Sequence, residues 1–204
     1  MKVGTDGVLL GAWARGGGSI LDVGTGTGVI ALMMAQRFPQ ARVTAVDIDE
    51  GAVSQAMANV GRSPFASRVT VLRQRVQEHQ GRYDAVVSNP PYFIGSLGAP
   101  DRQRHLARHA LTLTYGELMA AARRLLAADG ELSVVVPFDY RRRMEDEAIF
   151  QGFFPSRVCA VHTTAAKPAR RFLLAFRLQP CELVAESLTI GDAGYQSLTR
   201  DFYL

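Results

Sequence analysis

The stretch LDVGTGTGVIAL, residues 21–32, determines the expected fold of this chain. It begins with residues typical of a strand, continues through three glycines at alternate positions and ends in a run typical of a buried helix. Glycine allows the backbone to turn sharply and to approach a ligand closely. The stretch therefore predicts a strand, a tight loop and a helix, which together begin a βαβ unit. An acid, Asp22, precedes the first glycine, Gly24, by two positions.

Further strands and helices follow in alternation along the chain. Strands are predicted over residues 19–24, 41–49, 68–74, 83–89, 131–137, 157–164 and 171–178, and helices over residues 28–38, 51–62, 115–130 and 140–153. The helix at 115–130 is predicted to end at Gly130, and the two last strands to form an antiparallel pair. Alternation of this kind predicts an α/β fold with a central, mostly parallel seven-stranded sheet, one antiparallel edge strand and helices on both faces.

Length, charge and cysteine content favour a cytoplasmic protein of a single domain. The 204 residues suit a single domain over residues 1–204, and no apolar run reaches the roughly 20 residues that a membrane helix needs. The formal net charge of +4 is a mild lean toward polyanions such as nucleic acid. Cys159 and Cys181 have no metal-ligand spacing, which favours reduced cysteines and a cytoplasmic protein.

A second acid stands where a ligand of this fold would bind. Open parallel sheets bind ligands at the carboxyl ends of their strands, and Asp47 lies at the end of the strand predicted over residues 41–49. A carboxylate there can accept hydrogen bonds from ribose hydroxyls. Asp49, two residues later, is expected to cap the next helix.

The glycine loop and Asp47 together resemble the cofactor site of the class I methyltransferases, which use S-adenosylmethionine (AdoMet). A dinucleotide fold is the competitor, but its glycine spacing differs and it does not explain residues 89–92. The resemblance implies a Rossmann-like fold, no metal and a cofactor site that includes Asp22, Gly24, Thr25, Gly26, Gly28, Asp47, Ile48, Val76 and Asn89.

The stretch SNPPYF, residues 88–93, follows the fourth predicted strand. An amine conjugated to a ring is a poor nucleophile, and two acceptors aimed at its N–H bonds favour the tetrahedral geometry that methylation requires. The Asn89 side chain and the Pro90 carbonyl can supply these acceptors, held in place by the stiff turn that Pro90 and Pro91 form. Tyr92 offers a ring on which a base can stack. In class I methyltransferases such a tetrapeptide marks transfer to adenine N6, guanine N2 or glutamine N5.

Two further stretches narrow the resemblance. The opening MKVGTDGVLLGAWA, residues 1–14, and the ending YQSLTRDFYL resemble the bacterial tRNA(Val) adenine-37 N6-methyltransferases. This resemblance adds Thr5 and Asp6 to the cofactor site and implies tRNA as the partner. The sequence does not indicate the oligomeric state, and a monomer is assumed. It also implies RNA contacts from Phe93, Arg102, Arg104 and Arg108. That family usually carries a further segment before MKVGTDG, which the present sequence lacks.

Three alternatives remain open at this point. A glutamine-N5 methyltransferase of release factors shares the tetrapeptide but usually has an N-terminal helical domain. A DNA adenine methyltransferase needs a target-recognition domain, for which the chain has no room. A module that binds RNA without chemistry is disfavoured by the presence of Asp22, Asp47 and Asn89.

Overall fold

The structure is a computed structural model, and it describes residues 4–92 and 113–202. The strands are β1 Ser19–Val23, β2 Arg42–Asp47, β3 Val69–Arg73, β4 Tyr83–Ser88, β5 Leu126–Pro137, β6 Phe154–His162, β7 Arg171–Arg177 and β8 Val184–Thr189. The helices are α1 Thr5–Trp13, α2 Val29–Arg37, α3 Glu50–Gly61, α5 Tyr115–Leu125, α6 Arg141–Phe150 and α7 Ala193–Thr199, with a short 3-10 helix η1 at Phe138–Tyr140.

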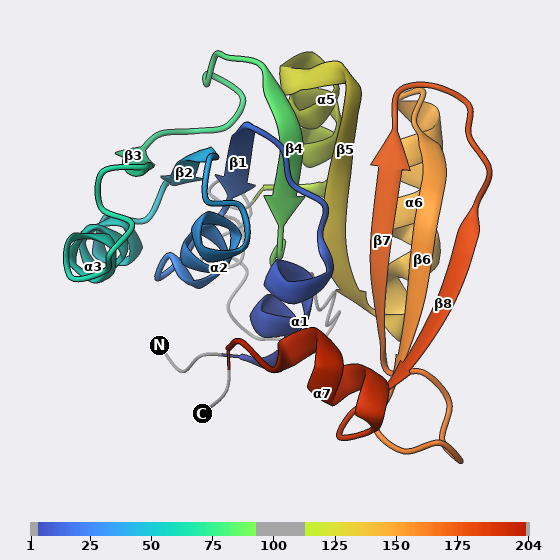
Figure 1. The fold of residues 1–204 in the computed structure, drawn as a ribbon. Coiled ribbons are helices and arrows are strands. Elements are labelled where there is room, and N and C mark those ends of the chain that lie inside the picture. Colours follow the sequence, from blue (N-terminus) through green and yellow to red (C-terminus); the bar gives the residue numbers. More distant parts are fainter. Residues whose placement is uncertain (1–3, 93–112, 203–204) are drawn as a thin grey trace, which may run out of the picture.

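The strands form one sheet in the order β3-β2-β1-β4-β5-β7-β6-β8 (Figure 1). Neighbours from β3 to β5 are parallel, β7 is antiparallel to both β5 and β6, and β8 is parallel to β6. The predicted α/β architecture and the predicted antiparallel β6–β7 pair are therefore confirmed. Two details were wrong: over the described residues the sheet has eight strands instead of seven, and the antiparallel strand is internal instead of at the edge.

Burial explains the order of the last three strands. All five central residues of β7 are buried, whereas β6 alternates and β8 is exposed over its first four residues. The most apolar strand gains most from two neighbours and from cover on both faces, so it takes the inner position. The polar strand β8 can stand at the edge, and its weak apolar pattern is the reason that the sequence did not indicate a strand there.

Helices cover the sheet on both faces. In Figure 1, α1, α2 and α3 lie in front of the sheet, and α5 and α6 lie behind it. The front core joins α1 to α3 with side chains such as Ile20 and Val87, and the rear core joins α5 and α6 with Leu21 and Val86. Consecutive strand residues therefore enter opposite cores, as the pleat of a sheet requires. No helix in the described parts of the chain is long and apolar enough to span a membrane.

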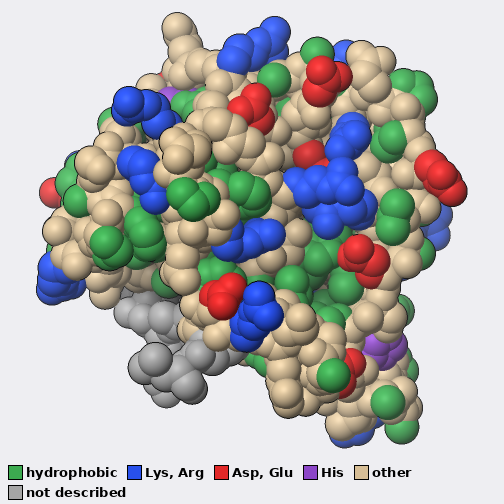
Figure 2. Space-filling view, viewed as in Figure 1, with side chains coloured by type: hydrophobic (Ala, Val, Ile, Leu, Met, Phe, Trp, Pro, Cys, Tyr) green, Lys and Arg blue, Asp and Glu red, His purple; other side chains and the backbone are tan. Residues whose placement is uncertain are grey.

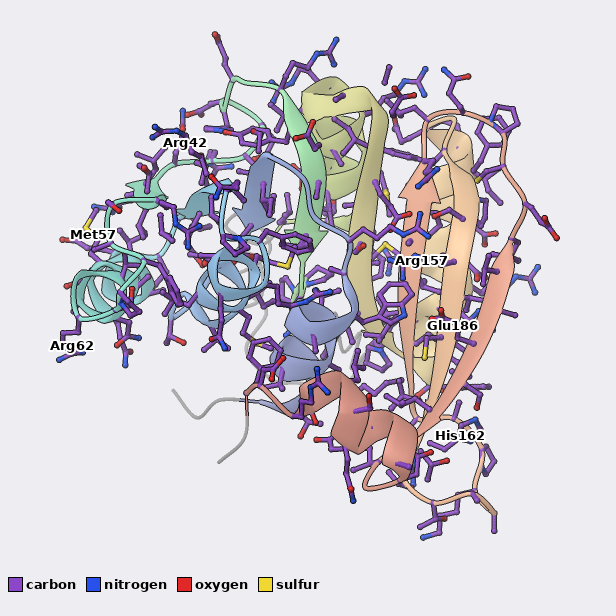
Figure 3. All side chains as sticks on the ribbon, in the orientation of Figure 1. Arg42, Met57, Arg62, Arg157, His162 and Glu186 are labelled. Carbon is purple, nitrogen blue, oxygen red and sulfur yellow. The ribbon has the colours of Figure 1, made fainter. Side chains whose placement is uncertain are left out.

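Helix α1 packs closely against α2, and the sequence did not indicate it because glycines interrupt its apolar run. A Cβ atom on Gly11 would lie 2.7 Å from the sulfur of Met33 in α2, so only glycine permits this approach. The last residue of α1, Trp13, donates from its indole nitrogen to Glu186 of β8. The guanidinium of Arg157 lies 3.9 Å from the centre of the Trp13 ring. Arg157 and Glu186 both lie in front of the sheet (Figure 3).

A cluster of charges joins β5, β6 and β7 on this front face. Glu131 is 3% exposed and accepts from Arg157 at 2.7 Å and from Arg177 at 3.3 Å, while Arg15 lies 3.7 Å away. Figure 2 shows basic side chains gathered over this part of the sheet. Three arginines compensate the negative charge of the buried Glu131 carboxylate, whose burial without such partners would be strongly destabilising. Glu131 lies in the middle of β5, six residues before its carboxyl end, and does not line the cavity described below.

One predicted helix boundary was wrong. Helix α5 ends at Leu125 and β5 begins at Leu126, so Gly130 lies in the strand and does not close the helix. A Cβ atom on Gly130 would lie 2.9 Å from the Asp84 carbonyl oxygen of β4. The glycine is therefore explained by close contact between two strands.

Candidate active site

A cavity of about 560 Å³ opens at the carboxyl ends of β1, β2 and β4. These are the strand ends at which the sequence placed the site. The residues that line the cavity include Gly24, Gly26, Asp47, Ile48, Gln74, Arg75, Val76, Gln77, Ser88, Asn89, Pro90, Pro91, Thr114 and Glu117.

The glycine loop forms one wall of the cavity. Gly24 has a φ of +69° and Gly26 a φ of +56°, which are left-handed conformations that other residues rarely adopt. The Gly24 amide donates to the Val46 carbonyl at 2.9 Å, and the Gly26 amide donates to Oδ2 of Asp47 at 2.9 Å. The loop is thereby fastened to the end of β2 before any ligand binds.

Asp47 connects the loop to the start of α3. Its Oδ1 accepts from the Asp49 amide at 3.0 Å, so each carboxylate oxygen has one backbone donor and a further lone pair. Asp49 caps α3 by accepting from the Ala52 amide at 2.7 Å, as predicted. Asp47 thus faces the cavity as an oriented acceptor of the kind that binds ribose hydroxyls.

Asp22 lies behind the loop and is fully buried. Its Oδ2 accepts from the Thr25 hydroxyl at 2.6 Å and from the Ala31 amide at 3.0 Å, which joins the loop to α2. Its Oδ1 has no hydrogen-bond partner among the described residues. Burial raises the pKa of Asp22 to about 7, because a charged carboxylate is poorly solvated there.

The loop after β3 forms the opposite wall, and α5 holds it in place. Gln74, Arg75, Val76 and Gln77 line the cavity, and Val76 is 4% exposed. The Arg124 guanidinium of α5 donates to the carbonyls of Val76 at 3.0 Å, Gln77 at 3.1 Å and His79 at 2.5 Å. Sequence reasoning could not find this contact, because Arg124 is remote along the chain and its helix position is ordinary.

The start of α5 adds an acid that the sequence analysis missed. Thr114 and Glu117 form a capping box and both line the cavity. The Thr114 backbone N–H, which donates to the Glu117 carboxylate at 2.8 Å, lowers the pKa of Glu117. Glu117 is therefore ionised near neutral pH. The pattern Thr-x-x-Glu over residues 114–117 is a recognised signal for a helix start and could have indicated this position.

The tetrapeptide at residues 89–92 follows β4 directly. Ser88 donates to the Val23 carbonyl at 2.8 Å and so fixes the end of β4 to that of β1. Asn89, Pro90 and Pro91 line the cavity beside the glycine loop. Tyr92 stacks on Tyr140 of η1, with ring centroids 6.2 Å apart. Its hydroxyl oxygen lies 2.8 Å from Oδ1 of Asn89.

Comparisons with known proteins agree with this geometry. The family model described as methyltransferase small domain matches residues 4–154. A tRNA1(Val) (adenine(37)-N6)-methyltransferase of Bacteroides thetaiotaomicron is 42% identical over 100% of this chain and 91% of its own length. The same-named protein of Serratia proteamaculans is 41% identical over 100% of this chain and 84% of its own length. The chain belongs to the tRNA1(Val) (adenine(37)-N6)-methyltransferase family.

Solved structures show the fold alone, at low identity. A predicted O-methyltransferase from Agrobacterium tumefaciens has a TM-score of 0.75 at 18% identity, over 96% of both chains. A glycopeptide N-methyltransferase in complex with AdoMet has a TM-score of 0.63 at 13% identity, over 88% of this chain and 90% of its own. These likenesses confirm the Rossmann-like methyltransferase fold.

The cavity of this methyltransferase fits AdoMet. The glycine loop permits close approach, Asp47 presents acceptors at the end of β2, and buried Val76 offers an apolar contact for a ring. The Asn89 end of the cavity lies beside the loop, where the cofactor's reactive end is expected. AdoMet is the cofactor of the family, which confirms that prediction. Within residues 4–92 and 113–202, no group of three or more potential metal ligands occurs.

The predicted cofactor residues fall into two groups. Gly24, Gly26, Asp47, Ile48, Val76 and Asn89 line the cavity of the methyltransferase, whereas Thr5, Asp6, Asp22, Thr25 and Gly28 do not. Asp22 and Thr25 lie behind the glycine loop and support it, and Gly28 caps α2 with a φ of +84°. The roles of both groups in binding AdoMet stay predictions.

Thr5 and Asp6, at the start of α1, line a second, smaller cavity with Arg170 and Arg171. Asp6 contacts the tetrapeptide, because its Oδ2 lies 3.0 Å from the Tyr92 hydroxyl. The predicted RNA contacts Phe93, Arg102, Arg104 and Arg108 lie outside the described residues.

Proposed function

We propose that this methyltransferase transfers a methyl group from AdoMet to the exocyclic N6 of adenosine 37 in a tRNA of the tRNA1(Val) type, in the cytoplasm. The observation that carries the proposal is the position of Asn89 and Pro90 in the cavity, directly beside the glycine loop and at the end of β4. The names of relatives more than 40% identical over the whole chain support the tRNA substrate.

The residues of the tetrapeptide have separate tasks in this proposal. AdoMet, when bound, supplies an electrophilic methyl group. The Asn89 side-chain oxygen and the Pro90 carbonyl accept from the two N–H bonds of the target amine, which turns its lone pair toward the methyl group. Pro90 and Pro91 keep these acceptors in place before the substrate arrives. Tyr92 provides a ring on which the base can stack, a contact worth about 1–3 kcal/mol.

Tritiated AdoMet distinguishes the candidate substrates. The protein is incubated with unmodified bulk tRNA or with a release factor, and labelled tRNA is then digested to nucleosides. The proposal expects label in tRNA and its recovery as N6-methyladenosine. Label in the release factor alone would identify a glutamine methyltransferase, and label in neither substrate would favour a module without chemistry.

Substitution Asn89→Ala tests the assigned chemistry. It removes one of the two acceptors but leaves the glycine loop and Asp47 in place. We expect kcat for methyl transfer to fall by at least about 100-fold, since a preorganised group of this kind contributes that much. The dissociation constant for AdoMet, measured by calorimetry, should stay within about twofold, which corresponds to less than 1 kcal/mol.

Gln36→Ala is the matched control for that variant. The Gln36 amide donates to the Asp201 carbonyl on the exposed surface, and neither residue lines the cavity. It should leave both kcat and AdoMet affinity unchanged. Full activity of Asn89→Ala would refute the proposed mechanism.

A further inference from the structure

The Tyr92 hydroxyl lies between two acceptors from different parts of the chain. Its oxygen is 3.0 Å from Oδ2 of Asp6 in α1 and 2.8 Å from Oδ1 of Asn89. A phenol has one proton, so it can donate to only one of these oxygens at a time. Which acceptor takes the proton therefore determines whether the Asn89 oxygen is occupied.

Asp6 is the stronger of the two acceptors. A carboxylate carries a full negative charge, and hydrogen bonds to ionised acceptors are roughly twice as strong as those to a neutral amide. The Nε of Arg171 in β7 donates to the other oxygen of Asp6 at 2.6 Å, which leaves Oδ2 for Tyr92.

The surroundings keep the Tyr92 hydroxyl protonated. Burial, followed by the negative charge of Asp6, raises its pKa well above the ordinary range. Tyr92 is thus a permanent donor at neutral pH, and its proton must go to Asp6 or to Asn89.

We propose that Asp6 is a positioning residue that takes the Tyr92 proton and so leaves the Asn89 amide oxygen free for the substrate amine. The inference rests on the role proposed above for Asn89. With its proton on Asp6, the Tyr92 oxygen can only accept. An amide can present either its oxygen or its nitrogen at a given place, and the surrounding hydrogen bonds decide which. Asn89 then donates from Nδ2 to Tyr92, and its oxygen turns to the amine.

Loss of the carboxylate reverses this arrangement. Without Asp6, the strongest remaining acceptor of the Tyr92 proton among these groups is Oδ1 of Asn89, at 2.8 Å. The oxygen that the reaction needs would then already hold a hydrogen bond. The charge at the start of α1, which contacts Tyr92 four residues after the end of β4, would in this way control the acceptor after β4 without touching the substrate.

A double-mutant cycle with Asp6→Asn and Tyr92→Phe tests the inference. Tyr92→Phe keeps the ring but removes the proton in question, and it is the background in which the effect of Asp6→Asn is measured again, whatever its own kcat. Asp6→Asn alone should lower kcat about 10- to 100-fold, because a full loss of such an acceptor costs about 100-fold or more. In the Tyr92→Phe background, the same change should lower kcat less than about threefold.

Three outcomes of this cycle would overturn the inference. An equal loss in both backgrounds would show that Asp6 acts on the structure and not through the Tyr92 proton. A weaker dissociation constant for AdoMet in Asp6→Asn, with kcat retained, would make Asp6 a cofactor contact instead. If Asp6→Asn changed neither kcat nor the dissociation constant for AdoMet, Asp6 would have no role in the reaction.

The same four proteins are also compared in urea unfolding without any substrate. If Asp6 accepts the Tyr92 proton, the losses of the two single variants should be non-additive, because Tyr92→Phe removes the same hydrogen bond that Asp6→Asn weakens. Additive losses would overturn the inference whatever the methyl acceptor is. If the unchanged protein transfers no methyl group to tRNA while the unfolding cycle is non-additive, the proposed function fails and the contact stands.

Discussion

The carboxyl group of Asp22 supports the glycine loop at an electrostatic cost. It holds Thr25 and Ala31 through one oxygen, while the other has no partner among the described residues. Its pKa is raised from 3.8 to about 7 by burial. The folded protein therefore binds this proton more tightly than the unfolded chain does. Stability must then fall as pH rises from about 4 to about 7, and the full cost is present above that range.

Substitution Asp22→Asn tests whether the ionisation of Asp22 lowers stability as the pH rises. The side chain of the variant cannot ionise at this position. Between pH 5 and pH 8, the unfolding free energy of the variant should therefore rise relative to that of the unchanged protein by on the order of 2 kcal/mol. Urea unfolding at both pH values measures it. Glu50→Gln, a change at an exposed acid of α3, is the control and should show no such shift. An equal difference at both pH values for Asp22→Asn would contradict the account.

At single residues, the sequence indicated the positions that local chemistry determines. Asp47 lines the cavity and Asp49 caps α3, because each follows directly from its place at a strand end or a helix start. The bond from Tyr92 to Asp6 joins residues 86 positions apart and has no local signal. Asp6 was predicted from resemblance alone, and its contact with the tetrapeptide could be found only in three dimensions.

At the scale of elements, α5 determines the shape of the loop that follows β3. Arg124 holds three carbonyls of that loop, and Glu117 from the same helix faces the cavity. The loop contributes Val76 and its neighbours to the cavity wall. A helix on the rear face of the sheet therefore orders one side of the site.

Arg124→Ala should weaken AdoMet binding without abolishing methyl transfer at saturation. Without the guanidinium, the loop after β3 must become ordered when AdoMet binds. If this ordering costs about 1 kcal/mol of binding free energy, the dissociation constant rises roughly fivefold. Calorimetry with AdoMet measures it. Arg123→Ala is matched, since that neighbouring arginine holds the carbonyls of Gln151 and Gly152, which do not line the cavity. Equal affinity in the two variants would refute the role of Arg124.

Element boundaries and order were the least predictable part of the fold. Helix α1 was not predicted because glycines interrupt its apolar run, although one of them, Gly11, lies where α2 approaches closely. The hairpin of β6 and β7 was predicted, but a hairpin can join a sheet through either of its strands. Burial decided for β7, whose central residues are all apolar. The run RFLLAFR carried that information in the sequence.

For the whole molecule, the ends of β1, β2 and β4 bring three distant stretches into one cavity. The glycine loop, Asp47 and Asn89 were each predicted from a strand end, and the parallel sheet is what places them together. The basic RNA contacts expected from Arg102, Arg104 and Arg108 lie outside the described residues, so they stay predictions. The overall formal charge of +4 is compatible with a polyanionic substrate.

The most direct test of the central claim compares two transcripts of tRNA1(Val) that differ only at position 37. One carries adenine there and the other guanine, and both are incubated with this protein and AdoMet before digestion and mass spectrometry of the nucleosides. We expect N6-methyladenosine from the adenine transcript and none from the guanine transcript. N6-methyladenosine from both transcripts, or from neither, would contradict it.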